Sequence, residues 1–158
     1  MILNESMSDL IRNGVNFDRP ISTEISGILF DGFLIKDGCY FFSRLLEKVV
    51  GVKLEDFQDR TGYECFVNSF HVEDYDDIDP VSQAIIFIAK VFEVWCGNYY
   101  SIDLRAIMSC DDLSVVVKFH VDREAEEWLA GSLEDYIDPV LSVDSSENIV
   151  ALLKKYYD

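Results

Sequence analysis

Two histidines are the only side chains of this chain whose ordinary pKa lies near neutral pH, and each precedes a carboxylate by two residues. His71 precedes Glu73, and His120 precedes Asp122. Residues two apart lie on the same face of an extended strand, so each histidine is expected to hydrogen-bond its carboxylate. A pair of this kind can transfer protons as a general acid or base. It occurs more often as a purely structural hydrogen bond.

The other features that catalysis requires are missing from the sequence. No serine or cysteine stands in a nucleophile elbow, no glycine loop matches a phosphate-binding motif, and histidines and cysteines do not cluster at metal-ligand spacing. We therefore expect no enzyme activity, no cofactor and no metal, and a small hydrolase is the least favoured alternative.

Carboxylates are concentrated in segments 73–79, 111–112 and 122–138, which hold five, two and seven acidic residues. The first segment has oxygen ligands for a divalent cation but lacks the spacing of a calcium-binding loop. Solvated acidic loops are one interpretation. A docking surface for a basic partner is the other, because carboxylates attract a cationic surface and interleaved aromatic side chains fill its pockets. The residues predicted to contact such a partner are Glu73, Asp74, Tyr75, Asp76, Asp77, Asp111, Asp112, Asp122, Glu124, Glu126, Glu127, Trp128, Glu134, Asp135 and Tyr136.

The overall charge excludes several classes of partner. The 158 residues include 30 acidic and 13 basic side chains, which give a formal net charge of −17 at pH 7. Nucleic-acid binding draws most of its affinity from Lys and Arg neutralising phosphates, so direct binding to nucleic acid is not expected. The same sign of charge disfavours anionic membranes, and the apolar stretch 84–95 is too short to span a bilayer. Because 49% of the residues are hydrophobic and 13% aromatic, the chain is expected to fold as an acidic domain.

Four cysteines occur, and their spacing matches neither a CxxC pair nor a zinc motif. Free cysteine behaves as a small buried hydrophobe. The first ten residues also lack the basic and apolar regions of a secretory signal. We therefore expect reduced core thiols in a cytoplasmic protein. The cysteines are Cys39, Cys65, Cys96 and Cys110.

The elements that position these residues are predicted to form a single α+β domain, in which a mainly antiparallel sheet packs against several helices. The predicted helices cover residues 8–13, a stretch between Asp37 and Gly51, residues 80–96 and residues 147–156, with a helical turn at 124–129. The predicted strands cover residues 21–35 (one bent strand or two short ones), 65–72, 101–109, 114–121 and 140–143. The third and fourth strands form a hairpin, whose tip carries Asp111 and Asp112.

Short patterns in the second half of the chain, over about residues 65–144, match a known class of protein. They are FVNSFHVEDY at 66–75, IMSCDD at 107–112, VKFHVDR at 117–123, EWL at 127–129, LEDY at 133–136 and VLSVD at 140–144. In these patterns and their order, the chain resembles the immunity proteins of bacterial contact-dependent growth inhibition systems.

The resemblance implies a function: such proteins bind and neutralise the C-terminal toxin domain of a partner exoprotein, often a nuclease, here by stoichiometric occlusion. A nuclease must present a basic surface to phosphates, so a strongly acidic inhibitor complements it. Complementary charge raises association rates to about 10⁸–10⁹ M⁻¹s⁻¹ at low salt. An acidic nucleic-acid mimic that titrates a host DNA-binding protein is the alternative.

Overall fold

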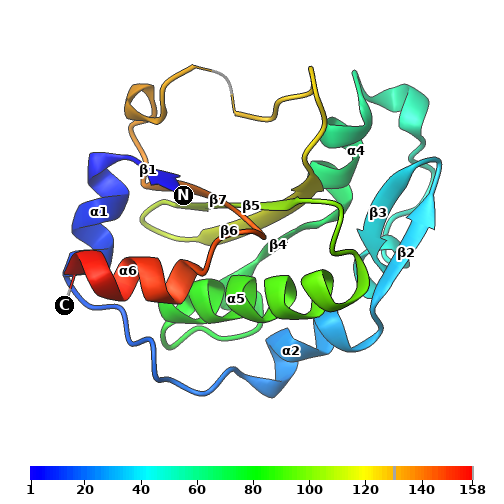
Figure 1. Ribbon diagram of the computed structural model, residues 1–158. Helices are drawn as coiled ribbons and strands as arrows, with labels where there is room; N and C mark the ends of the chain where they lie inside the picture. The colour runs from blue at the N-terminus through cyan, green and yellow to red at the C-terminus, as the bar shows by residue number, and fades with distance from the viewer. Residues whose placement is uncertain (130, 158) are drawn as a thin grey trace.

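An antiparallel sheet of five strands, in the order β1-β7-β5-β6-β4, lies at the centre of the molecule (Figure 1). The computed structural model describes residues 1–129 and 131–157. The strands are β1 (Ile2–Leu3), β4 (Ser69–His71), β5 (Leu104–Cys110), β6 (Val115–Val121) and β7 (Val140–Asp144). The predicted hairpin is confirmed as β5 and β6, in which Arg105 pairs with His120 and Ile107 with Lys118. The α+β class is confirmed as well.

The inner face of the sheet packs on α5 (Pro80–Asn98), α6 (Ile149–Tyr157) and α1 (Glu5–Arg12), which Figure 1 shows below and beside the strands. Alternation along β6 sends Val117 and Phe119 into this core, where both are fully buried. Helix α5 begins as predicted, because Asp79 accepts a hydrogen bond from the Ser82 N–H at 3.2 Å. By length and composition α5 is apolar enough to cross a membrane, but it is mostly buried here and serves as the core helix.

The outer face of the sheet carries Arg105, Ile107, His120 and Ser142, and it is covered by α4 (Arg60–Val67) and by the segment 122–139. Within this segment, η3 (Leu133–Asp135) packs Leu133 against Ile107. This face therefore has a thinner cover than the inner one, since an irregular segment replaces a helix over β5 and β7.

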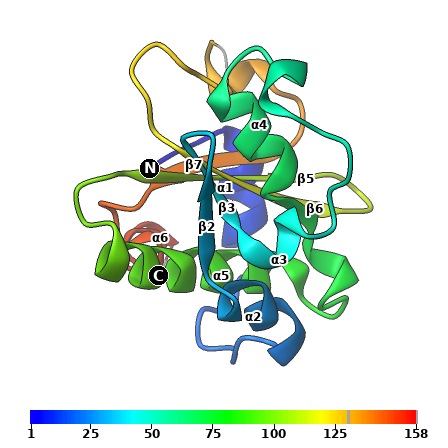
Figure 2. The same cartoon turned by 90° about the vertical axis from the view of Figure 1, so that its right-hand side faces the viewer.

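A separate hairpin of β2 (Phe33–Lys36) and β3 (Cys39–Phe42) stands beside the main sheet, from the level of α4 down to α2 (Figure 2). The prediction of a helix between Asp37 and Gly51 is wrong for the first part of that stretch. Asp37 and Gly38 both have positive φ values, 54° and 74°, which close a tight two-residue hairpin turn. Only α3 (Ser43–Leu46) remains helical.

Two predicted strands are also wrong in part. Residues 23–30 form α2 (Thr23–Phe30), because Ser22 caps its first turn and Ile25 and Ile28, three apart, pack into the core. Residues 65–67 close α4, because Asp59 accepts from the Gly62 N–H at 2.7 Å and begins the helix upstream. The remaining short elements are η1 (Leu54–Asp56) and η2 (Val72–Asp74).

The segment 124–129 forms no helical turn. Arg123 and Glu126 instead pair as an isolated antiparallel bridge, and Ala125 between them has a φ of 66°. The segment therefore turns tightly away from the end of β6 before it crosses the outer face. The predicted N-terminal helix, the strand at 140–143 and the C-terminal helix are confirmed as α1, β7 and α6.

Candidate functional site

The three acidic segments approach one another at the tip of the β5–β6 hairpin. The Val115 N–H donates to Glu73 Oε2 at 2.9 Å, which ties segment 73–79 to the hairpin. On the other side of the hairpin, the Cys110 N–H donates to the carbonyl of Pro139 at 3.0 Å. The end of segment 122–138 therefore lies beside the same tip, opposite segment 73–79.

Several of the predicted contact residues are used inside the fold. Asp76 pairs with Arg19 at 2.9 Å. Asp111 accepts from the N–H groups of Leu113 and Ser114 at 2.8 and 2.7 Å, and these hydrogen bonds hold the pKa of its carboxyl below the ordinary value. These carboxylates shape their turns and are less available to a partner.

Glu73 forms the first of the two predicted histidine pairs. His71 Nδ1 lies 3.1 Å from Glu73 Oε1, so this pair is confirmed as a structural contact on the surface. Burial alone would raise the pKa of Glu73, but hydrogen bonds from the Val115 N–H and from His71 outweigh it and lower the pKa.

Other predicted residues remain exposed. Within the described parts of the three acidic segments, several surface carboxylates neither accept a hydrogen bond nor pair with a cation. We call them the free carboxylates. They are the predicted residues Asp74, Asp77, Asp112, Glu124, Glu127 and Asp135, together with Asp138, which was not among the predicted contacts. Glu134 differs from them, because it accepts from the Glu5 N–H at 3.3 Å.

The three predicted aromatic contacts differ in exposure. Trp128 is 41% exposed, and the Lys118 Nζ lies 5.7 Å from the centre of its ring. Tyr75 is half-buried against Phe70, and Tyr136 is half-buried against the small cluster that contains Ile107. Trp128 is therefore the aromatic residue best placed to contact a partner.

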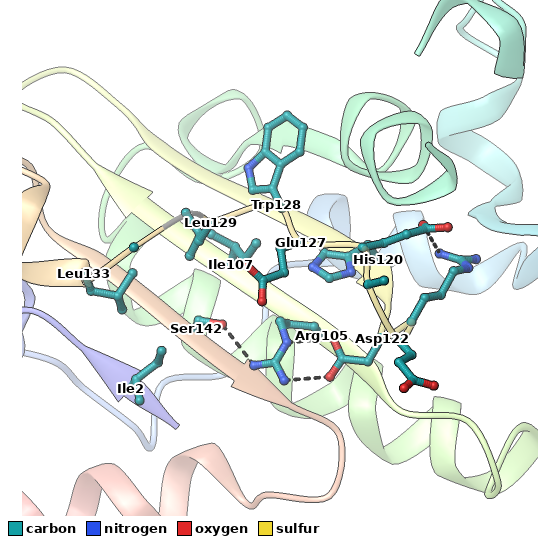
Figure 3. Close-up of a pocket in the computed structure, with 15 residues that line it drawn as sticks. Ile2, Arg105, Ile107, His120, Asp122, Glu127, Trp128, Leu129, Leu133 and Ser142 are labelled. Carbon is teal, nitrogen blue, oxygen red and sulfur yellow. Dashed lines mark hydrogen bonds and ion pairs between the residues drawn. The ribbon is translucent and has the colours of Figure 1, made fainter. Parts of the chain in front are cut away.

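A cleft of about 640 Å³ opens between the outer face of the sheet and segment 122–133 (Figure 3). We call it the outer cleft. Its floor comes from β5, β6 and β7, and its wall comes from the acidic segment. The floor residues are Arg105, Ile107, His120 and Ser142, and the wall includes Asp122, Glu124, Glu127, Trp128, Leu129 and Leu133.

Arg105 forms the positively charged part of the floor, and its charge is balanced locally. It binds Asp122 bidentately, with Nε to Oδ1 at 2.7 Å and Nη2 to Oδ2 at 2.6 Å. Its Nη1 donates to Ser142 Oγ at 3.2 Å, and Asp144 lies 3.8 Å away. The hydrogen bonds with Asp122 raise the pKa of the guanidinium further. Arg105 is thus already paired and does not attract an anion to the outer cleft.

The predicted pair between His120 and Asp122 is wrong. Arg105 is the direct cross-strand neighbour of His120, and its guanidinium takes both oxygens of Asp122. His120 is only 3% exposed, and its Nδ1 lies 3.0 Å from the carbonyl of Val121. Since a carbonyl only accepts, Nδ1 carries the proton.

The other ring nitrogen of His120 has no partner among the described residues. Nε2 is buried within the fold and unbonded. Burial lowers the pKa of His120, so the ring is neutral near pH 7 and Nε2 presents a lone pair. In the part of the chain that the structure describes, no group of three or more His, Cys, Asp or Glu side chains is arranged to hold a metal ion. Nε2 is therefore an unfilled hydrogen-bond acceptor of a residue that lines the floor of the outer cleft.

Glu64 holds the start of the acidic segment in place, a role that the sequence did not reveal. It is fully buried on α4 and binds Arg123 through both oxygens, at 2.6 and 2.9 Å. It also accepts from the N–H groups of Val121 and Tyr40, each at 2.7 Å. This single carboxylate therefore joins α4, β3 and β6 to the segment that forms the wall of the outer cleft.

Comparison of the sequence with known proteins identifies the family of this chain. Residues 2–152 match the model described as the "Uncharacterized protein PM0498 family". The chain is 29% identical to the "Uncharacterized protein PM0498" of Pasteurella multocida (strain Pm70), over 76% of this chain and 85% of that protein. No solved structure matches it significantly. Since the family model spans nearly the whole chain, the protein belongs to the PM0498 family.

Proposed function

We propose that this protein is an immunity protein, which binds and neutralises a basic toxin domain by stoichiometric occlusion. The observation that carries the proposal is the group of free carboxylates, which belong to the segments around the hairpin tip and the outer cleft. A solvated surface loop needs no aromatic residue, but here Trp128 is partly exposed among them. Aromatic residues are enriched at protein interfaces, and carboxylates around such a residue complement a basic partner.

The distribution of positive charge supports the same proposal. Many basic side chains are already paired with carboxylates of the chain itself, so they do little to offset the free carboxylates. The paired residues are Arg12, Arg19, Arg44, Lys90, Arg105, Arg123 and Lys154. The surface left to a partner is therefore strongly negative, and it would steer a basic protein into contact.

We place this function in the cytoplasm, where a toxin that enters the cell would act. The cysteines support a reducing compartment, because all four are free thiols. Burial raises the pKa of the Cys39 thiol to about 11 and that of Cys110 to about 12, so both are unreactive. Cys96 departs from the expected core position, because it is exposed at the end of α5.

The proposal predicts that a large exoprotein is encoded directly upstream, and the experiment uses the C-terminal domain of that exoprotein. We expect the two proteins to form a 1:1 complex that survives moderate salt and abolishes the toxicity of that domain. The triple variant Asp74→Asn, Asp77→Asn, Asp112→Asn should fold normally, because these carboxylates bind nothing within the described residues. Its association rate should fall roughly tenfold at low salt, and the difference should vanish at high salt.

The matched control removes three exposed carboxylates elsewhere: Glu24→Gln, Glu47→Gln and Glu55→Gln. It should associate at a rate closer to that of the wild type. If the upstream domain does not bind, the proposed function is wrong. Capture of unrelated host DNA-binding proteins, competed by DNA, would instead support the nucleic-acid mimic.

A further inference from the structure

The outer cleft combines three features that complement one kind of chemical group. Its wall holds Glu127, an exposed carboxylate without a partner among the described residues. Trp128 follows it directly and also lines the cleft, with its ring on the other side of the segment from the Glu127 carboxylate (Figure 3). The floor holds the unbonded Nε2 of His120. The negative charge and the buried acceptor fit a cation that also has several N–H donors, and the indole offers an apolar contact beside them.

Figure 3 shows how these groups lie relative to one another. The side chain of Glu127 extends from the segment across the sheet, and the ring of His120 is turned toward it. The four acidic side chains that line the cleft outnumber the two arginines, and both arginines are engaged with carboxylates of the fold. An incoming cation therefore meets uncompensated negative charge at the wall.

The His120 acceptor is a second, independent sign of a ligand. Buried ring nitrogens normally find a hydrogen-bond partner, and leaving one without a partner destabilises the fold. Because Nδ1 donates to Val121, the ring cannot turn its proton toward the cleft without losing that bond. The His120 ring can therefore accept a hydrogen bond from a ligand at Nε2 but cannot donate one there.

We propose that the outer cleft receives an arginine side chain of the partner protein, which pairs with Glu127 and donates to His120 Nε2, while Trp128 packs against the residues that flank this arginine. Guanidinium suits these groups better than ammonium, since its planar fork can donate to two acceptors at the same time. The cleft volume of about 640 Å³ also leaves room for residues that flank the arginine. This inference rests on the proposed function for its occupant, and it deepens that function by assigning a specificity pocket.

The first test needs only this protein and small probes. Nα-acetyl-arginine amide is titrated into labelled protein at 150 mM salt, and the shifts of the Trp128 indole N–H and the His120 ring nitrogens are followed by NMR. Nα-acetyl-citrulline amide, which has the same shape without the charge, is the matched probe. We expect saturable shifts in the millimolar range with the arginine probe and none with citrulline. Equal shifts from both probes, or none at these two residues, would overturn the proposal.

Variants connect the probe to the residues and to the partner. Glu127→Gln should weaken binding of the arginine probe at least fivefold, whereas Glu24→Gln, on α2 beyond the opposite face of the sheet, should leave it unchanged (Figure 1). Glu127→Gln should also speed dissociation of the toxin complex. If the complex forms but Glu127→Gln and Trp128→Ala dissociate like the wild type, the pocket proposal fails while the immunity function stands. If the probe binds and the upstream domain does not, the proposed function fails, and with it the assignment of the occupant to that partner, while the guanidinium site itself stands.

Discussion

At the scale of single residues, Glu64 is a buried acid that joins several elements of the fold, although it was not among the acids predicted to contact a partner. It satisfies two backbone N–H groups and one guanidinium, all close to the start of the acidic segment. Arg123 is also mostly buried, with 17% of its side chain exposed. Removal of one member of a buried pair leaves the other charge without a partner and is strongly destabilising.

We therefore expect Glu64→Ala to lower the free energy of unfolding by about 3–5 kcal/mol. The exposed Glu55→Ala should change it by less than about 0.5 kcal/mol. Urea denaturation followed by circular dichroism measures both values. A loss below about 1 kcal/mol in Glu64→Ala would show that water replaces the carboxylate, and that Glu64 does not hold the acidic segment in place.

At the scale of elements, the turn between β2 and β3 depends on Gly38. Any residue at this position must adopt a φ of 74°, which L-residues other than Asn and Asp rarely do. Gly38→Ala should therefore destabilise the protein by about 1–2 kcal/mol. Gly38→Asn introduces the same Cβ, 3.0 Å from Arg60 Nε, but tolerates this φ, so it should cost less. Equal losses in thermal denaturation would assign the effect to the clash with Arg60 instead.

Sequence patterns predict the long elements of this fold correctly but not the short β2–β3 hairpin. Helix α5 and the β5–β6 hairpin are strongly periodic over many residues, so their local pattern predicts them. The β2–β3 hairpin has only four residues per strand, and its aromatic run at 40–42 also fits the spacing of a helix. The Asp37-Gly38 dipeptide was the signal for a turn, but a helix cap uses the same residue type.

Local sequence patterns could not predict the outer cleft, for a different reason. Its floor joins residues from three strands, and only the register places Arg105 beside His120 and near Ser142. The two-residue spacing at the end of β6 favoured a hydrogen bond between His120 and Asp122, but Arg105 on the neighbouring strand binds this carboxylate instead. The acidic wall, in contrast, could be predicted from the sequence, because its residues lie in one short segment of the chain.

At the scale of the whole molecule, two opposing effects govern how stability depends on pH. Acidification toward the isoelectric point near 4.2 reduces the repulsion among surplus carboxylates, which favours the folded state. Buried neutral His120 acts in the other direction. Its pKa is lower in the folded protein than in the unfolded chain, so below about pH 6.5 the unfolded chain binds more protons and stability falls.

The histidine effect is separated from the charge effect by comparing variants at each pH. His120→Gln cannot titrate, so the wild type should lose stability relative to it as pH falls from 7 to 5, by at most about 1.4 kcal/mol per pH unit. The carboxylates with lowered pKa, Glu73, Asp111 and Asp144, act in the same direction at lower pH and are common to both proteins. Urea unfolding at each pH measures the difference, with the exposed His71→Gln as control. Parallel curves for the wild type and His120→Gln would mean that His120 accepts its second proton inside the fold, and the ring would then be a donor at the cleft instead of the acceptor that an arginine requires.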